Sequence, residues 1–498
     1  MTQVLLILCA LGGVTFVEVD LPGLRVGDLN PLTGKAPSNW RQSDVDGDGA
    51  VDLVLPDRVF FQRGGVFSRR ACTLLPDVGD RARCDIDGDT LYFMLPQRLE
   101  VIQWRDDAWQ TIHDQAMVWP PDALFSTAAL MDTDQSVTFH RFVHEFDGDK
   151  TPELVVAARD GVHIFSKEGG AYVEAAVLDV LPPLRPAHGE QQLLWPPEKR
   201  RIVFPARQMN CRVYLVGNEI GVLSWHDARG AQIVYELVRY AVDPGKNYAL
   251  DAKAPEVECS APLPPHIRPC RLDKNEQLDF AGGEWELAEA AVLPVPIFET
   301  YASLDGGRTS QTRRTRSFRP NCSFVDFDGD GDLDMVTEQT GLFEGGVRES
   351  INRFLTQRHV EHSVQVYRQD ARGRFPRLPD VSGRFTIYLD AAPFHGSGFF
   401  HCYLAGELLN IAGDFDGDGY NDVLLRDRSD RLSVFLAAGR GFESVPAARL
   451  FVPHEARVGV ADVNGDGLSD IVVRSFAERE NGRAEISRVF LARAGEEP

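Results

Sequence analysis

The chain has 498 residues, of which 43 % are hydrophobic, so it has enough apolar material for a sizeable core. Lys and Arg total 52 against 74 Asp and Glu, which gives a formal net charge of −22. This acidic balance argues against nucleic acid and anionic membrane surfaces as partners, because both are bound through basic surfaces. A protein that binds cations fits the balance better.

The first 13 residues have features of a signal peptide. Val4 to Leu11 is an apolar run of suitable length, and Ala10-Leu11-Gly12 supplies small residues for cleavage. No Lys or Arg precedes the run, and an ordinary buried strand is the alternative. We expect residues 1–13 to be removed and the remainder to be exported to the periplasm, the cell surface or the medium. No other segment has the length and apolarity of a transmembrane helix.

One acidic motif recurs along the chain, which is typical of repeat architectures. It reads DVDGDGAVDLVL from Asp44, EFDGDKTPELVV from Glu145, DFDGDGDLDMVT from Asp326, DFDGDGYNDVLL from Asp414 and DVNGDGLSDIVV from Asp462. A weaker copy, DIDGDTLYFMLP from Asp85, has Phe93 where the last acid should stand.

The spacing of these acids predicts calcium as the cofactor. Calcium takes about six to eight oxygen ligands, and acids at positions 1, 3 and 5 of a curled loop can turn inward around it. Gly at position 6 allows the positive φ of the curl, position 7 offers its carbonyl, and an acid at position 9 completes the set. We expect four to five sites, the uncertain one being the copy at Glu145, where Lys150 replaces the glycine. The expected ligands are Asp44, Asp46, Asp48, Ala50, Asp52, Glu145, Asp147, Asp149, Thr151, Glu153, Asp326, Asp328, Asp330, Asp332, Asp334, Asp414, Asp416, Asp418, Tyr420, Asp422, Asp462, Asn464, Asp466, Leu468 and Asp470.

Two other interpretations of the loops fit less well. An EF-hand needs an acid at position 12 and a following helix, whereas position 12 is Leu55, Thr337, Leu425 or Val473 and short β-rich runs follow. Solvated acidic turns without an ion are the second alternative. Carboxylates about 5 Å apart would then repel by roughly 3 kcal/mol per pair at an effective dielectric of about 20, in every copy.

The segments around each loop predict a β-propeller. After Asp422 come VLLRD, RLSVFLAAG and FESVPAARLF, and after Glu153 come LVVAARD, GVHIFSKEGG and AYVEAAVL, with turn residues between them. Each unit therefore has four short antiparallel strands, the cation loop joining the first to the second. The copies from residues 44 and 85 are 41 residues apart, and those from 414 and 462 are 48 apart, which suits one propeller blade each. The expected fold class is all-β, a propeller of four-stranded antiparallel blades.

We count seven blades, with eight as the alternative. Six start near residues 40, 80, 138, 318, 405 and 455, and RRIVFPA, CRVYLVGN, GVLSWHD and QIVYELVRY predict another without a cation loop. The last blade is one strand short, and VTFVEVDL at 14–21 can supply that strand and remove an open edge. Residues 14–498 are then expected to form a single propeller domain with irregular insertions near 243–317 and 338–362.

The first insertion and the cysteines suggest further features. The insertion is Pro-rich and ends in a basic run with Arg308, Arg313, Arg314, Arg316 and Arg319, which could dock an anionic glycan or a protein; a solvated loop is the alternative. Cys259 with Cys270, and Cys72 with Cys84, are candidate disulfides.

The repeated loops resemble those of the FG-GAP/VCBS repeat β-propellers, which include the head of integrin α subunits. The resemblance covers roughly residues 40–195 and 318–496 and is most specific at the loops. It implies that calcium binds between the first two strands of a blade, in a propeller that usually has seven blades and belongs to an exported or cell-surface protein.

The sequence assigns no catalytic residue. It contains no HExxH, GxSxG, P-loop or dinucleotide-binding motif, and His359 with His362, or Ser397 in HGSG, are weak candidates. We expect an interaction scaffold with structural calcium and a protein or glycan ligand, more readily than an enzyme. The alternatives are a calcium-dependent carbohydrate-active enzyme of the polysaccharide-lyase type, or a lectin, on the same fold. The tryptophans lack the regular spacing that a sugar pocket repeated between blades would need.

Overall fold

The computed structural model describes residues 14–21, 24, 40–55, 57–74, 82–120, 137–139, 141–158, 160–180, 185–186, 207–208, 211–216, 219–227, 233–250, 256–263, 267–270, 272–274, 279–288, 295–304, 309–316, 321–340, 356, 359–388, 409–453, 456–479 and 482–494. The proposed signal peptide, residues 1–13, lies outside these ranges, as does Ser397. The chain divides into two compact units, residues 1–75 with 266–498, and residues 76–265. Each is described by itself.

Among the described residues of the first unit, four sheets each contain four antiparallel strands that follow one another in chain order. The first comprises β2 (Arg41–Ser43), β3 (Asp52–Leu55), β4 (Arg58–Arg63) and β5 (Val66–Leu74). The second comprises β22 (Ile267–Cys270), β23 (Asp279–Ala288), β24 (Val295–Leu304) and β25 (Thr309–Arg316). The third comprises β26 (Asn321–Val325), β27 (Asp334–Thr340), β28 (His359–Tyr367) and β29 (Val381–Tyr388), extended by β34 (Gly441–Phe442) and β33 (Ala437–Ala438). The fourth comprises β30 (Leu409–Gly413), β31 (Asp422–Arg428), β32 (Arg431–Phe435) and β35 (Ala448–Phe451).

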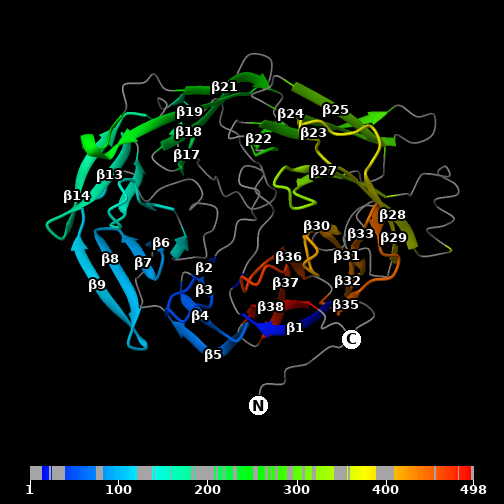
Figure 1. Cartoon of the computed structure of the whole chain (residues 1–498), viewed down its shortest axis with the longest axis horizontal. Coiled ribbons are helices and arrows are strands. Elements are labelled where there is room, and N and C mark those ends of the chain that lie inside the picture. Colours follow the sequence, from blue (N-terminus) through cyan, green and yellow to red (C-terminus); the bar gives the residue numbers. More distant parts are fainter. Residues whose placement is uncertain are drawn as a thin grey trace. The chain divides into compact units, whose positions relative to one another are not determined.

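The fifth sheet of this unit joins the two ends of the chain. It contains β36 (Arg457–Ala461), β37 (Asp470–Arg479), β38 (Gly482–Ala494) and β1 (Val14–Asp20) in the order β1-β38-β37-β36. Strand β1 runs antiparallel to β38 from the pair Val14 and Ala494 to the pair Asp20 and Arg488, and Figure 1 shows the two side by side. This confirms the prediction that residues 14–21 complete the last blade.

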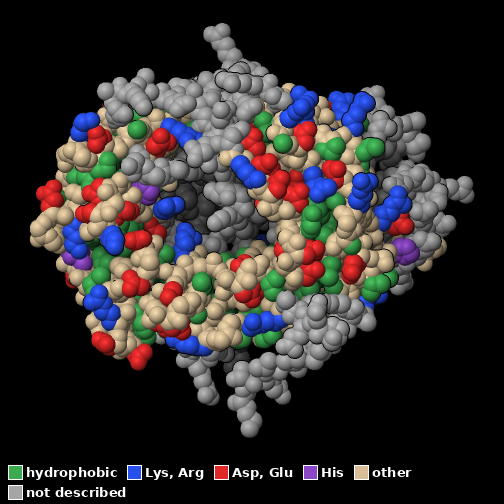
Figure 2. Space-filling model, viewed as in Figure 1, with side chains coloured by type: hydrophobic (Ala, Val, Ile, Leu, Met, Phe, Trp, Pro, Cys, Tyr) green, Lys and Arg blue, Asp and Glu red, His purple; other side chains and the backbone are tan. Residues whose placement is uncertain are grey.

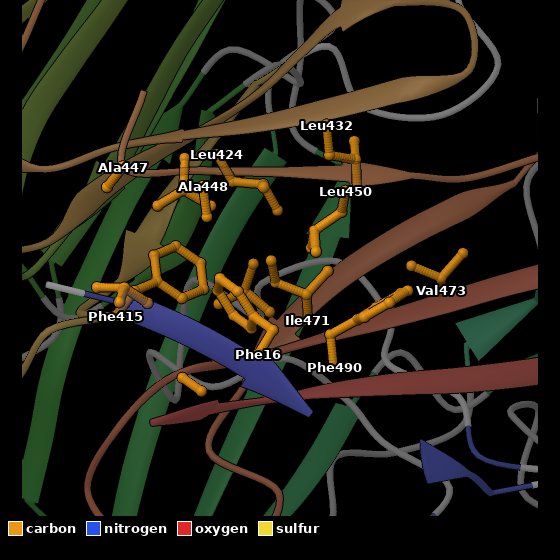
Figure 3. Close-up of a cluster of buried hydrophobic side chains, with 14 of the residues drawn as sticks. Phe16, Phe415, Leu424, Leu432, Ala447, Ala448, Leu450, Ile471, Val473 and Phe490 are labelled. Carbon is orange, nitrogen blue, oxygen red and sulfur yellow. The ribbon is translucent and has the colours of Figure 1, made fainter. Parts of the chain in front are cut away.

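Apolar side chains that alternate along these strands build the core between neighbouring sheets. Phe16 on β1 is 6 % exposed and meets the fully buried Phe415 edge-on, with ring centroids 5.9 Å apart. Figure 3 shows both rings among Leu424, Ile471 and Phe490. Strand β1 therefore packs against the sheet that contains β30 and β31, in addition to completing its own sheet.

The second unit contains three sheets of the same kind. The first has β6 (Ala82–Asp87), β7 (Thr90–Leu95), β8 (Arg98–Arg105) and β9 (Ala108–Ala116), with β10 (Val137–Phe139) parallel to β6. The second has β11 (Val143–His144), β12 (Glu153–Ala158), β13 (Gly161–Glu168) and β14 (Ala171–Leu178). The third has β17 (Cys211–Val216), β18 (Glu219–Asp227), β19 (Ile233–Asp243) and β21 (Glu256–Leu263), with β20 (Ala249–Leu250) also on β19. A pair, β15 (Arg185–Pro186) with β16 (Arg207–Gln208), and one 3-10 turn, η1 (Pro244–Lys246), accompany them.

The chain is thus an all-β protein built of four-stranded antiparallel sheets, the topology of propeller blades, as predicted. The described residues contain eight sheets with four antiparallel strands in succession, one more than the seven favoured by the sequence and equal to the alternative number. A single propeller domain over residues 14–498 stays a prediction.

The prediction of an irregular insertion near residues 243–317 is wrong for the described part. Strands β21 to β25 occupy most of it. The prolines of this segment suggested irregular structure. Pro262 and Pro269 instead lie on the strands β21 and β22, each of which pairs with a single neighbouring strand. An edge strand tolerates proline, since one side of its backbone donates no ladder hydrogen bond. Most of the second insertion, near residues 338–362, lies outside the described residues.

The candidate disulfides do not form in this structure. Cys84 and Cys270 are buried thiols that take part in no disulfide. Burial raises the pKa of the Cys270 thiol well above its usual range, which keeps it protonated and unreactive.

Candidate metal centre

Each of the five acidic loops joins the first two strands of a sheet. Loops 44–52, 326–334, 414–422 and 462–470 precede β3, β27, β31 and β37 in the first unit, and loop 145–153 precedes β12 in the second. The weaker copy from Asp85 has a different structure, because β6 pairs with β7 up to Asp87 and Thr90, leaving only a two-residue turn. That copy therefore has no loop in which acids could gather.

The glycines of the motif provide the curl. Gly417 and Gly419, at positions 4 and 6, have φ of 81° and 87°, and the same two positions are left-handed in the other three loops that have glycine at both. In loop 145–153, Lys150 takes position 6 and still has φ of 70°. A left-handed residue with a side chain costs about 1–2 kcal/mol, so this loop adopts the shared conformation against its local preference.

The acid at position 1 holds the loop closed from inside. Asp414 accepts hydrogen bonds from the backbone N–H groups of Gly417 at 2.7 Å and Gly419 at 2.9 Å. Asp44 and Asp462 accept the equivalent bonds. At position 5, Asp418 accepts from the N–H of Tyr420, which fixes the position 7 residue. Hydrogen bonds from the loop's own backbone thus orient the acidic side chains at positions 1 and 5.

The curl brings the expected ligands together in four loops. Carboxylate oxygens of three acids lie within 4.8 Å of one another in each of the sets Asp44, Asp46 and Asp48; Glu145, Asp147 and Asp149; Asp326, Asp328 and Asp330; and Asp414, Asp416 and Asp422. In loop 462–470, Asn464 replaces the second aspartate, and its amide donates to Asp466 at 2.8 Å.

The donor set fits a hard divalent cation. Three carboxylate oxygens, Oδ1 of Asp46, Asp326 and Asp328, are buried within the described residues without a hydrogen-bond partner. A buried ionised oxygen without a partner is costly, and a cation of the size and oxygen preference of calcium would satisfy it. The residues at positions 1, 3 and 5 would hold such an ion, and its positive charge would neutralise the carboxylates of the loop.

The acid at position 9 has a second role that the sequence did not reveal. Asp422 is fully buried; its Oδ2 accepts from the N–H of Phe415 at 2.9 Å and its Oδ1 from that of Ala437 at 2.7 Å. Asp52, Asp334 and Asp470 are buried with the same pair of bonds, one to position 2 of their own loop and one to a residue in or just after the third strand of the sheet. Position 9 therefore anchors the loop to its sheet, and each oxygen retains a lone pair for an ion.

Burial and mutual repulsion make these carboxyls hard to ionise without a cation. Burial raises the pKa of Asp422 to about 8 and that of Asp334 to about 7. At position 3, burial and then the Asp418 charge raise the pKa of Asp416. A bound cation would reverse these effects by favouring the ionised forms.

Arginines already pair with two of the loops. Arg63 on β4 donates a hydrogen bond to Asp46 and places Nη1 2.8 Å from Oδ2 of Asp48. Arg368 places Nη1 3.4 Å from Oδ2 of Asp328. Figure 2 likewise shows acidic and basic side chains intermixed on the face in view. The loops therefore differ in the positive charge that the protein itself supplies.

Loop 145–153 uses a side chain as its anchor. Oε2 of Glu153 accepts from the N–H of Phe146 at 3.0 Å, and Oε1 accepts from the hydroxyl of Tyr248 at 2.7 Å. The longer Glu side chain thus keeps the bond to position 2 and replaces the second backbone donor by a tyrosine.

A further degenerate copy of the motif precedes Asp279 and was not predicted from the sequence. Asp279 is fully buried and accepts a 2.7 Å hydrogen bond from the N–H of Leu272, the bond that defines position 9 in the other copies. Aligned on this bond, Arg271 stands at position 1 and Lys274 replaces the first glycine. The only signal in the sequence was an apolar residue seven places before an aspartate that begins a strand.

The weak candidates from the sequence belong to strands. His359 and His362 lie on β28, where His362 is 1 % exposed with Nε2 3.4 Å from Oε2 of Glu338. The basic run is mostly strand β25. Its Arg313 stacks on Tyr367, with the guanidinium carbon 3.5 Å from the ring centroid, and Arg314 pairs with Glu299 at 2.8 Å. Both arginines are thus engaged within the unit.

Comparison with known proteins identifies part of the chain. Residues 414–473 match the family of FG-GAP-like repeats. No curated protein matches the chain in sequence. Among solved structures, the WD40 domain of SCAP from fission yeast is similar at 10 % identity, over 96 % of this chain and 89 % of that one, with a TM-score of 0.31, a likeness too distant to bear on function. The matched residues, 414–473, hold the loops from Asp414 and Asp462 and the strands between them, and their match to FG-GAP-like repeats agrees with the resemblance seen in the sequence.

Proposed function

We propose that this protein is an exported interaction scaffold whose acidic loops bind calcium, and that calcium holds the blades together rather than taking part in a reaction. The observation that carries the proposal is the set of buried, unpartnered oxygens on Asp46, Asp326 and Asp328, which stand at positions 1 and 3 of repeated loops. Four loops each gather three acids, at positions 1, 3 and 5 in three of them and at positions 1, 3 and 9 in loop 414–422, which favours a repeated structural site over a single active site.

The hydrogen bonds of position 9 support the structural role. Asp422 links the start of its loop, at Phe415, to Ala437 beyond β32. An ion held by Asp414, Asp416 and Asp422 would add a cross-link between the curl and this anchor. Carboxylates held in this way would be ionised and poor proton donors, so they suit fastening better than acid–base catalysis.

The expected affinity supports action outside the cell. Calcium sites of extracellular modules have dissociation constants of roughly 10⁻⁴ to 10⁻³ M, so they fill where calcium is abundant. The FG-GAP-like match supports the same placement, through the resemblance to exported and cell-surface propellers. No helix in the described residues has the length and apolarity of a membrane crossing. We propose a protein or a glycan as the ligand of the scaffold.

Thermal unfolding with and without calcium tests the metal role. Calcium at ten times its dissociation constant stabilises the folded state by about 1.4 kcal/mol per site, so several sites should raise the melting temperature by several degrees over that in a chelator. Magnesium at the same concentration should do less, because it prefers smaller, more regular sites. Equal melting temperatures in calcium and chelator would contradict the proposal.

A pair of variants locates the effect. Replacing Asp416 and Asp418 together with Asn should remove part of the calcium-dependent stabilisation. Asp430→Asn, which removes an exposed charge from the turn after β31, is the matched control and should keep all of it. A binding screen against glycans and extracellular proteins, with and without calcium, then tests the scaffold. Turnover of a polysaccharide in that screen would favour the enzyme alternative instead.

A further inference from the structure

Neighbouring acidic loops in the first unit are joined directly by hydrogen bonds. The N–H of Ser469 donates to the carbonyl oxygen of Asp414 at 2.7 Å, and the N–H of Asn421 donates to that of Phe327 at 2.8 Å. The side-chain amide of Asn421 also donates to the carbonyl oxygen of Asp326 at 2.6 Å. In each case position 8 of one loop bonds to position 1 or 2 of the loop before it.

The same connection extends in both directions. At one end, the N–H of Leu333, position 8 of loop 326–334, donates to the carbonyl oxygen of Leu272 at 2.6 Å. At the other, the side chain of Gln62 donates to the carbonyl oxygen of Asn464 at 2.6 Å. Loops 326–334, 414–422 and 462–470 therefore form one hydrogen-bonded series, preceded by the degenerate loop before Asp279. Loop 44–52 joins the series indirectly, through Gln62 on β4, whose backbone N–H donates to Asp52.

The loops are also in close contact. A Cβ placed on Gly329 would lie 3.1 Å from the carbonyl oxygen of Gly419, and one on Gly417 would lie 3.0 Å from Cδ2 of Leu468. Glycine at position 4 therefore leaves room for the close approach of the next loop, in addition to allowing the left-handed curl.

We propose that these bonds couple the calcium sites, so that an ion bound in one loop raises the affinity of the loop beside it. Position 8 lies between the carbonyl ligand at position 7 and the acid at position 9. An ion that orders this segment also holds the neighbour's position 1, and the neighbour then loses less conformational freedom when it binds its own ion. The coupling is reciprocal, because linkage between two binding equilibria must be. This inference rests on the calcium role proposed above.

Asn421 is the residue whose change isolates the coupling between loops 326–334 and 414–422. Its side chain is the donor to Asp326, and it supplies none of the expected calcium ligands. Ser469→Ala is the matched control, since Ser469 has the same position in the next loop but bonds to Asp414 through its backbone, which the change preserves.

Terbium luminescence reads one loop selectively. Tyr420 stands at position 7 of loop 414–422, where the other three loops of the first unit have Ala50, Asp332 and Leu468. Terbium emission excited through Tyr420 therefore reports this loop, and it is identified as the part of the emission that Tyr420→Phe abolishes. Terbium affinity is measured with loop 326–334 intact and with Asp328 and Asp330 both changed to Ala. Each measurement is made in the Asn421, Asn421→Ala and Ser469→Ala backgrounds, after thermal unfolding has confirmed that each variant folds.

With Asn421 present, and in Ser469→Ala, disabling loop 326–334 should weaken terbium binding at loop 414–422 by about fivefold or more, the usual size of such couplings. In Asn421→Ala the weakening should be smaller than in the protein with Asn421, because the side-chain bond to Asp326 is lost and the backbone bond to Phe327 remains. Equal affinity with and without the Asp328 and Asp330 carboxylates would overturn the coupling and leave the calcium role intact. A wild-type protein that gives no Tyr420-dependent emission would overturn both.

Discussion

Oδ2 of Asp422 accepts a 2.9 Å hydrogen bond from the backbone N–H of Phe415, seven residues earlier, and both residues are fully buried. Asp422→Ala removes this acceptor and the one for Ala437, leaving one buried and one part-buried N–H group without partners. Each such group costs about 1–3 kcal/mol, so the free energy of unfolding should fall by roughly 3 kcal/mol or more even in a chelator. Denaturant unfolding in calcium-free buffer measures this loss.

Asp418→Ala serves as the comparison for that experiment. Asp418 is exposed and accepts one bond, from Tyr420, so in the chelator its loss should cost only about 1 kcal/mol. Equal losses for the two variants would show that position 9 is no more important to the fold than position 5.

Arg63 is expected to weaken the calcium site of loop 44–52. It pairs with Asp46 and Asp48, two of the expected ligands, and places a positive charge beside the ion. Removing one charge near a divalent ion is worth about 1–2 kcal/mol in a wet site, so Arg63→Gln should tighten calcium binding about tenfold. Calorimetric titration measures the change. Arg431→Gln, which breaks a pair with Asp427 outside the loops, should leave all calcium affinities unaltered. A weaker site in Arg63→Gln would show instead that Arg63 prepares the ligands.

The terminal strand should be needed for stability. Phe16 on β1 is 6 % exposed and packs on Phe415, so Phe16→Ala is expected to cost about 3–5 kcal/mol. Phe451→Ala removes a phenylalanine that is 58 % exposed on β35 and should change stability by less than about 0.5 kcal/mol. Thermal or urea unfolding separates the two. Similar losses would argue against the packing of β1 on this sheet.

In the second unit, His163 lies between two carboxylates. Its Nε2 is 3.0 Å from Oδ1 of Asp160 and its Nδ1 is 3.0 Å from Oε2 of Glu174. The hydrogen bond from His163 lowers the pKa of Asp160. Because the folded pKa lies below the unfolded one, the pair stabilises the unit above the unfolded pKa and ceases to do so as pH falls through the folded pKa. The carboxyl titration of Asp160, followed by NMR, should shift to higher pH in His163→Asn; an unmoved titration would exclude this bond.

The sequence predicted the loops well because the acids there are constrained by local geometry. The curl needs Gly417 and Gly419 at fixed places, and Asp414 and Asp418 bond to N–H groups within a few residues. Such short-range requirements leave a readable pattern. The loop before Asp279 was missed because it keeps the anchor bond to Leu272 but has Lys274 in place of the glycine that gives the local signal.

The sheets were predicted less completely, for a different reason. Strands β17 to β19 were expected from their apolar residues, but the fourth strand, β21, comes from a segment in which Pro262 suggested a loop. Whether a strand tolerates proline depends on which of its two sides lacks a hydrogen-bonded partner. The arrangement of the neighbouring strands decides this, and the local sequence does not show it. The bond between Asn421 and Asp326 was equally invisible, since 95 residues separate its ends.

The pairing of β1 with β38 constrains how the protein is made. Residues 14–20 are translated long before their partners at 488–494. Strand β1 must therefore remain without its partner, and Phe16 without its core, until β38 has been made, and the sheet can be completed only then. An export pathway that keeps the chain unfolded until it has crossed the membrane would suit this order of events, because the first strand would meet its partner on the far side.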